Sequence, residues 1–329
     1  MCNWQNLRDM TADSLQEYLD GRIADGMSRG SANGRIEVCR AFGFWLAGKR
    51  MNGKRPVYNG SKRITSNPFA GMATYNPRID RRRHRRALTE DEMNWLLQVA
   101  RQRPLDDAMT IRRGPNKGKH QAKISEQRRV ELELLGHERA LIYKTLALTG
   151  LRKSELSSIR ESQVCLEHDT PYLDLHAADE KNTEGNDIVL RDDLAEDIRD
   201  WLTTRAEHEK ACEAAAEKPT LAISDHDDSA PVDEPLFNVP SGLLRILNRD
   251  LVAAGIAKKD ERGRSIDLHA MRHTFGTWLS KGGVAPRTAQ AAMRHSDIDL
   301  TMQVYTDPKL LDIRDAKRIC TKGLPSRSW

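Results

Sequence analysis

The first part of the chain has apolar residues at helical spacing. Leu15, Leu19 and Ile23 recur about one turn apart behind Thr11, a residue type that commonly begins a helix. A second apolar stretch runs from Ile36 and includes phenylalanine and tryptophan side chains. The pattern predicts a small helical domain.

Beyond residue 47 this periodicity is lost, and glycine, proline and arginine become frequent up to an arginine-rich run. A new domain is expected to begin at Thr89, because Thr89 and Glu92 fit a capping box ahead of an apolar helical pattern. A chain of this length can also form more than one core. The sequence thus predicts three regions: a helical domain at residues 1–75, a basic linker at residues 76–87 and a larger domain at residues 88–329.

The larger domain is expected to combine helices with a short sheet. One helix should end at Gly150, because glycine suits the left-handed position that follows a helix. Residues 172–177 and 188–190 have the composition of strands joined by a polar turn, and helical spacing returns from about residue 193. We therefore expect a mainly α fold with a small antiparallel β-sheet. Two polar stretches are expected to be insertions, the basic residues 103–129 and the acidic residues 207–235.

Charge is unevenly distributed along the 329 residues. Residues 1–87 hold 17 Lys and Arg against 7 Asp and Glu, a net of +10, whereas the whole chain carries +5. Clustered cations neutralise phosphates and release counterions, so the first quarter of the chain is the strongest candidate for a polyanion-binding surface. A solvated basic face is the alternative. The basic insertion at 103–129 is likewise either a plain loop or a DNA contact.

The five cysteines lie far apart without a C-x-x-C pair, so neither disulfides nor a zinc site is expected. No stretch approaches the roughly 18 apolar residues of a membrane span, and the N-terminus lacks the apolar core of a signal peptide. We therefore expect a cytoplasmic protein with no membrane partner.

Separated polar residues carry the candidate chemistry. One follows the predicted helix end, one lies at the predicted strand turn, two form an H-x-x-R box, and two lie near the end of the chain. Each alone has an ordinary explanation, such as a helix-end cation, a solvated turn, a core histidine or a packing aromatic. In chain order they are Arg152, Lys181, His269, Arg272, His295 and Tyr305.

The order and local sequence of these residues resemble the tyrosine recombinase (phage integrase) family. Residues 149–156 are similar to its first arginine motif, and residues 268–277 to its H-x-x-R box. Residues 181–190 resemble its lysine-bearing β-turn, and residues 293–305 resemble its final histidine and tyrosine motif. Four motifs in the family order make the resemblance specific. One departure is Arg294, because the residue before this histidine is usually glycine in the family.

The resemblance implies a fold and an activity. Residues 1–75 would be a helical SAM-like core-binding domain that begins inside its first helix, with no separate arm-binding domain. Residues 88–329 would be an integrase-type catalytic domain, and the two would close as a C-shaped clamp around duplex DNA. The implied reaction cuts and rejoins specific DNA sites through a 3′-phosphotyrosine intermediate, without metal, ATP or another cofactor.

The residue types suit this reaction. Guanidinium groups pair bidentately with phosphate, so Arg152 and Arg272 would stabilise charge that grows on the nonbridging oxygens. Tyr305 would be the nucleophile. Lys181 would protonate the leaving 5′-oxygen as a general acid.

The remaining assignments concern hydrogen bonds and protons. His269 and His295 would bond the phosphate or exchange a proton with Tyr305, which suits an imidazole that titrates near neutral pH. Glu155, one helical turn beyond Arg152, would orient the cations, although a surface carboxylate is equally consistent with its position. His273, next to the box, is interpreted as structural.

Three other functions fit some of these features. They are a type IB topoisomerase-like enzyme that relaxes DNA, an inactive DNA-binding regulator of the same fold, and a truncated remnant of a mobile element. For a recombinase we expect double-stranded DNA recombination sites as partners, a homotetramer on DNA, an accessory DNA-bending factor and a nucleoid-associated location. Apolar residues between 310 and 319 predict a terminal helix that is exchanged between subunits or packs in cis. The insertions favour a mobile-element integrase.

Overall fold

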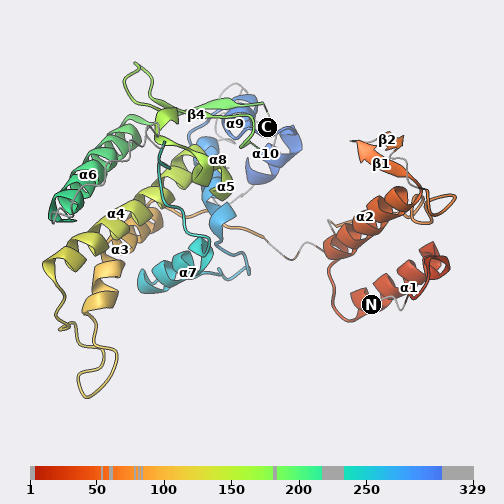
Figure 1. The fold of residues 1–329 in the computed structure, drawn as a ribbon, viewed down its shortest axis with the longest axis horizontal. Coiled ribbons are helices and arrows are strands. Elements are labelled where there is room, and N and C mark those ends of the chain that lie inside the picture. The colour runs from red at the N-terminus through yellow and green to blue at the C-terminus, as the bar shows by residue number, and fades with distance from the viewer. Residues whose placement is uncertain are drawn as a thin grey trace, which may run out of the picture. The chain divides into compact units, whose positions relative to one another are not determined.

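The computed structural model divides the chain into two compact units, Met1–His84 and Arg85–Trp329 (Figure 1). Lys181 and the terminal helix predicted near residues 310–319 lie outside the described residues. The described residues are 4–52, 55–58, 62–77, 79–80, 82, 84–180, 184–216 and 233–305.

The first unit contains the two predicted helices. The hydroxyl of Thr11 begins α1 by accepting a hydrogen bond from the Ser14 backbone N–H at 3.1 Å. An antiparallel hairpin follows α2, where the sequence indicated only irregular structure; its strands are short and rich in basic residues, so they carry little apolar alternation. The elements are the 3-10 helix Leu7–Asp9, α1 (Ala12–Ala24), α2 (Arg29–Leu46), β1 (Lys49–Asn52) and β2 (Arg55–Tyr58). The buried core consists of Met10, Leu15, Leu19, Ala32, Ile36, Leu46 and Phe69.

The second unit is mainly helical. The predicted capping box forms, because the Thr89 hydroxyl accepts from the Glu92 N–H at 3.1 Å and the Glu92 carboxylate accepts from the Thr89 N–H at 3.0 Å. Its helices are α3 (Glu90–Met109), α4 (Glu126–Thr149), α5 (Lys153–Ser158), α6 (Asp192–Ala216), α7 (Leu243–Ala253), α8 (Leu268–Lys281), α9 (Pro286–Ala292) and α10 (Ile298–Tyr305), with a 3-10 turn at Glu161–Gln163.

Helix α4 is the centre of this unit, and it packs against α3, α6 and α8. Figure 1 shows α3 and α4 as two long helices lying side by side. Gly136 permits this approach, because a Cβ atom there would lie 1.9 Å from the carbonyl oxygen of Arg101 in α3. Most residues from Leu141 to Thr149, at the C-terminal end of α4, are buried, and the candidate site is built around that end.

A small antiparallel sheet covers one end of the unit, in the order β3 (Val164–Cys165), β4 (Tyr172–Leu175) and β5 (Asn186–Val189). Leu173 pairs with Ile188, and both side chains are buried. The prediction of a mainly α fold with a small antiparallel sheet is confirmed. The two-residue strand β3 was not predicted, because two residues are too few to show a period.

The polar stretches expected to be insertions are shorter in the structure. Residues 103–109 continue α3 and residues 126–129 begin α4, which leaves residues 110–125 as the loop between them. Helix α6 continues to Ala216, so residues 207–216 are helical although their composition is acidic and polar. Residues 217–232 lie outside the described part of the chain. Among the helices that the structure describes, none has the length and apolar character needed to cross a membrane.

Candidate active site

Arg152 lies at a sharp turn between two helices. Helix α4 ends at Gly150, whose φ of 64° is left-handed, and whose N–H donates to the carbonyl of Leu146 at 3.2 Å. A Cβ atom on Gly150 would lie 2.6 Å from Cδ1 of Phe275, so this position also needs the absence of a side chain. Helix α5 starts directly after Arg152. The chain reversal thus places Arg152 at the fixed end of α4.

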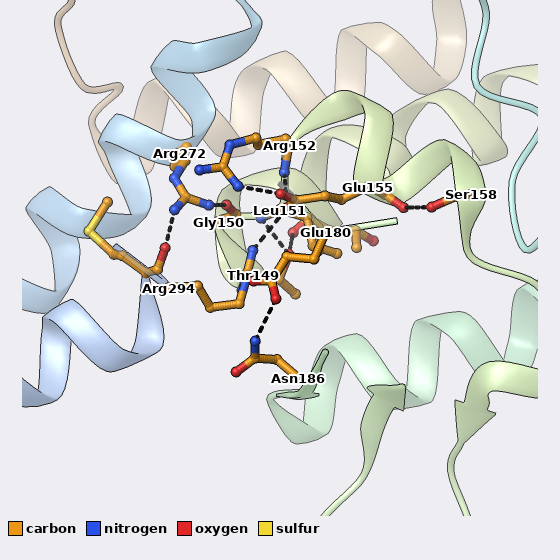
Figure 2. A network of polar contacts seen from close by, with 12 residues as sticks. Thr149, Gly150, Leu151, Arg152, Glu155, Ser158, Glu180, Asn186, Arg272 and Arg294 are labelled. Atoms are coloured by element: carbon orange, nitrogen blue, oxygen red, sulfur yellow. Dashed lines mark hydrogen bonds and ion pairs between the residues drawn. The ribbon is translucent and has the colours of Figure 1, made fainter. Parts of the chain in front are cut away.

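Arg272 reaches the same place from α8. Its guanidinium donates to the carbonyl of Gly150 at 2.5 Å and to the carbonyl of Met293. Figure 2 shows its guanidinium beside that of Arg152. Burial, together with the positive charges of Arg152 and Arg294, lowers the pKa of Arg272 to about 9, so it remains charged at neutral pH. Two backbone carbonyls from different segments therefore set the plane of this buried cation.

Glu155 is the anion between the cations. Its carboxylate accepts from the backbone N–H of Arg152 at 2.9 Å and from the Arg152 guanidinium, and it forms a 3.2 Å ion pair with Arg294. The side chain is only 1 % exposed. Burial alone would raise its pKa, but the hydrogen bonds from Arg152 and the charge of Arg294 lower it below the usual range. Glu155 is thus a charged, fully paired group, not a surface carboxylate.

Arg294 is a buried cation with an unusual backbone. Its φ is 50°, and among the described residues no other non-glycine has a positive φ. Its side chain is 4 % exposed and lies 3.5 Å from the carboxylate of Glu180, in addition to its pair with Glu155. Glu180 in turn accepts from the side-chain amide of Asn186 in β5 at 2.8 Å. The sequence pattern pointed to Arg294 only as a departure from the family, and it did not single out Glu180.

His295 follows Arg294 and contacts the last described helix. Its Nδ1 lies 3.0 Å from the hydroxyl of the buried Thr301 in α10. Burial, with the positive charges of Arg272, Arg152 and Arg294, lowers the pKa of His295 to about 4, so its ring is neutral at pH 7. Tyr305 is the last residue of α10, four residues after Thr301; its side chain lies outside the described part of the structure.

His269 lies near the start of α8, at the edge of this group. Asp267 begins that helix by accepting from the Ala270 N–H at 2.9 Å, and it is held by Arg85 through bonds of 2.9 and 3.0 Å. Partial burial and the charge of Arg85 lower the pKa of His269. Arg85, the first residue of the second unit, is thus bonded to Asp267, two residues before His269.

The structure brings five of the seven site residues predicted from sequence into one region. These are Arg152, Glu155, His269, Arg272 and His295. Lys181 and the Tyr305 side chain lie outside the described residues. Thr301 was missed, although its spacing of four residues from Tyr305 is a signal, since such residues share a helix face.

The matching family model is the phage integrase family, over residues 130–310, which is more than half of the chain. The chain belongs to the phage integrase family. Arg85, which binds Asp267 near His269, lies outside this matched segment. The other residues of the site lie within it.

Single relatives match this integrase-family chain more weakly. The tyrosine recombinase XerD of Listeria monocytogenes serotype 4b (strain F2365) is 36 % identical over 64 residues, which is 20 % of this chain and 21 % of XerD. XerD of Listeria innocua serovar 6a (strain ATCC BAA-680 / CLIP 11262) gives the same values. The match thus spans about a fifth of these curated relatives.

Solved structures share the fold over most of the chain. The XerH recombinase in a post-cleavage complex with palindromic difH substrate has a TM-score of 0.52 and 16 % identity, and the match covers 96 % of this chain and 71 % of XerH. A lambda integrase(75–356) dimer bound to a COC′ core site has a TM-score of 0.50 and 18 % identity, covering 92 % and 81 %. At these identities the likeness shows the fold alone.

Proposed function

We propose that this chain is a site-specific DNA recombinase that cuts and rejoins DNA through a covalent 3′-phosphotyrosine intermediate. The observation that carries the proposal is the meeting of Arg152 and Arg272 at the C-terminal end of α4, inside the segment that matches the family. The helix that ends in Tyr305 is joined to this group through the His295–Thr301 contact. Membership of the family and folds like those of DNA-bound XerH and lambda integrase support it.

The two arginines would bind the scissile phosphate. A guanidinium has five N–H donors, and Arg272 directs two toward backbone carbonyls, so its plane is fixed before DNA arrives. Such preorganised donors stabilise the transition state because no reorganisation is needed when charge develops on the phosphate oxygens. Glu155 would keep Arg152 oriented without cancelling the positive charge of the pair.

Tyr305 would attack the phosphorus atom. A new bond forms between the phenolic oxygen and phosphorus, the bond from phosphorus to the 5′-oxygen breaks, and a 5′-hydroxyl leaves. The phenolic proton needs an acceptor, and His295 would take it: with a pKa of about 4 its ring is neutral at pH 7, although so low a pKa also makes it a weak base. His269 would hydrogen-bond a phosphate oxygen.

Lys181 would protonate the departing 5′-oxygen. Its neighbour in the sequence, Glu180, forms an ion pair with Arg294. Because the phosphotyrosine bond conserves the energy of the broken bond, a 5′-hydroxyl from another strand can reverse the reaction. The proposed reaction would therefore need no ATP.

The wider assembly is part of the same proposal. The substrate would be a double-stranded recombination site of a mobile element, bound by the basic first unit as core-binding domain and by the second as catalytic domain. Four copies would act on two sites, exchanging the helix predicted near residues 310–319, with an accessory DNA-bending factor where the site requires it. Phosphate contacts would supply most of the affinity and a few base contacts the choice of site.

The test is a nicked suicide DNA substrate carrying the candidate site, chosen from repeats that flank the gene. Wild-type protein should form a covalent adduct that denaturing electrophoresis detects, and Tyr305→Phe should form none. An intact pair of sites should yield recombinant joints. An adduct with relaxation of supercoiled DNA but without joints would point instead to a type IB topoisomerase-like enzyme, and absence of any adduct would reject the catalytic proposal.

A further inference from the structure

Arg294 combines two costly features. A non-glycine residue in the left-handed region is strained, and the glycine usual at this place in the family would avoid that strain. Burying a guanidinium also requires partners to offset its lost hydration. The partners present are the carboxylates of Glu155 and Glu180, at 3.2 and 3.5 Å.

Those two carboxylates belong to different segments of the fold. Glu155 lies in α5 and also binds Arg152 through its backbone N–H and its guanidinium. Glu180 lies in the turn between β4 and β5 and also accepts from Asn186. Arg294 itself lies just after α9 and immediately before His295. Figure 2 shows this one side chain reaching toward both carboxylates. It is the point at which three segments of the site meet.

We propose that Arg294 is a positioning residue, which holds the His295 segment, the Arg152 segment and Glu180 in one reactive arrangement through its ion pairs with Glu155 and Glu180. This inference rests on the proposed recombinase function. In this role Arg294 does not contact the scissile phosphate. Its effect is on the rate of strand cleavage, and DNA binding is largely unaffected.

The ion pairs matter for geometry more than for stability. A buried ion pair is weak evidence of net stabilisation, because desolvation offsets much of the attraction. A displacement of about 1 Å in a reacting group, however, can slow a reaction about 100-fold. His295 follows Arg294 directly, and Glu155 binds the Arg152 guanidinium, so loss of Arg294 releases groups on two sides of the site.

The charge balance of the cluster supports the same role. Among the described residues of the cluster, three guanidiniums, of Arg152, Arg272 and Arg294, lie with two carboxylates, of Glu155 and Glu180. Without Arg294 the carboxylates would balance the two remaining arginines, and Glu180 would lose its ion-pair partner. A glycine at position 294 therefore requires a different set of neighbours.

The experiment compares Arg294→Gly, which keeps the left-handed backbone without strain, with Arg294→Lys and with Glu180→Gln. For each variant the dissociation constant for the nicked substrate, the single-turnover rate of adduct formation at saturating DNA and the melting temperature are measured. Arg287→Ala, which removes an exposed cation of α9, is the matched control.

We expect Arg294→Gly to bind DNA within about 3-fold of wild type and to cleave about 100-fold more slowly. Arg294→Lys should recover part of the rate, because an ammonium can still pair with a carboxylate. Glu180→Gln should cleave about 10-fold more slowly, and adding it to Arg294→Gly should cost little more, since both remove the same link. Arg287→Ala should behave as wild type.

A wild-type cleavage rate in Arg294→Gly would overturn the inference, as would additive losses in the double variant. If Arg294→Gly does not fold, the cleavage rate of Glu180→Gln is the test. A wild-type cleavage rate in that variant would also overturn the inference. Failure of the proposed function is a separate outcome, because then the wild-type protein itself forms no adduct.

Discussion

The Nδ1 atom of His295 lies 3.0 Å from the Oγ1 atom of Thr301, one helical turn before Tyr305. The hydroxyl is buried, so removing it leaves one imidazole nitrogen without this partner. We predict that Thr301→Val, which keeps the shape, lowers the free energy of unfolding by about 1–2 kcal/mol and slows adduct formation about tenfold. Urea unfolding and single-turnover cleavage measure the two effects. Thr301→Ser, which keeps the hydroxyl, should retain most of the rate.

The low pKa of His295 gives a pH dependence of stability. The ordinary value is 6.5 and the folded value about 4, so between these pH values the unfolded chain takes up a proton that the folded protein does not. The free energy of unfolding should therefore fall as pH decreases from 6.5 to 4. His295→Gln removes this contribution, and its loss of stability between pH 7.5 and pH 5 should be smaller than that of wild type. Equal losses in both proteins would contradict the assignment.

The same pKa constrains catalysis. If neutral His295 accepts the phenolic proton, the wild-type cleavage rate should not decline with an apparent pKa near 6.5 as the pH is lowered. A pH–rate profile between pH 5 and 8 checks this, and a loss of rate centred at 6.5 that disappears in His295→Gln would be evidence against it.

Gly150 is needed for two reasons that can be separated. Gly150→Ala would strain a left-handed backbone and place a methyl group against Phe275, whereas Gly255→Ala would strain a backbone of nearly equal φ, 65°, with nothing within 4 Å of the new Cβ. We predict a loss of about 1 kcal/mol of unfolding free energy for Gly255→Ala and about 2–4 kcal/mol for Gly150→Ala. Cleavage should fall only in Gly150→Ala, because that turn positions Arg152. Equal losses of stability in Gly150→Ala and Gly255→Ala would show that Phe275 moves away from the new methyl group.

The loop at residues 110–125 is predicted to contact DNA phosphates. It contains no Asp or Glu, and backbone bonds of 2.8 and 2.9 Å join Ile111 to Gly118 and Lys119. Replacing three of its exposed cations by alanine should weaken DNA binding about tenfold at 0.1 M salt and reduce the salt dependence of affinity, without changing the cleavage rate at saturating DNA. The three are Arg112, Arg113 and Lys117. Lys210→Ala, on the exposed acidic end of α6, is the control, and an unchanged salt slope in the triple variant would exclude the loop from the interface.

Lys181 has a chemical signature as general acid. A substrate with sulfur in place of the bridging 5′-oxygen has a leaving group that needs no proton. Lys181→Ala should therefore cleave ordinary DNA about 100-fold more slowly or worse and should approach the wild-type rate on the sulfur substrate. Persistence of the defect on the sulfur substrate would assign the leaving-group proton to another residue.

Much of the fold could be predicted from local signals. The capping box at Thr89, the helix end at Gly150 and the pairing region around β4 and β5 each depend on a few neighbouring residues, and the structure has them. Composition was a poor guide at the ends of the polar stretches. Both α3 and α6 extend into these stretches, over residues 103–109 and 207–216, because their earlier turns are buried in the core. The local polar composition gives no information about that burial.

The site residues divide in the same way. Arg152, His269, Arg272 and His295 lie in short motifs and could be selected from sequence. Of their supporting contacts, the local one between Arg152 and Glu155 could also be predicted, but those between distant positions could not: Glu180 lies 114 positions before Arg294, and the carbonyl of Gly150 lies 122 positions before Arg272. Burial and ion pairing depend on tertiary packing, which no local pattern encodes.

The left-handed conformation of Arg294 also limits how this protein can be combined with others. A chimera that receives the segment from α9 to α10 from a relative with glycine before the histidine would lack the cation that Glu155 and Glu180 share. The reverse graft would separate Arg294 from the carboxylates of Glu155 and Glu180, which lie outside the grafted segment. Exchange between such relatives should therefore succeed only when all three segments are moved together.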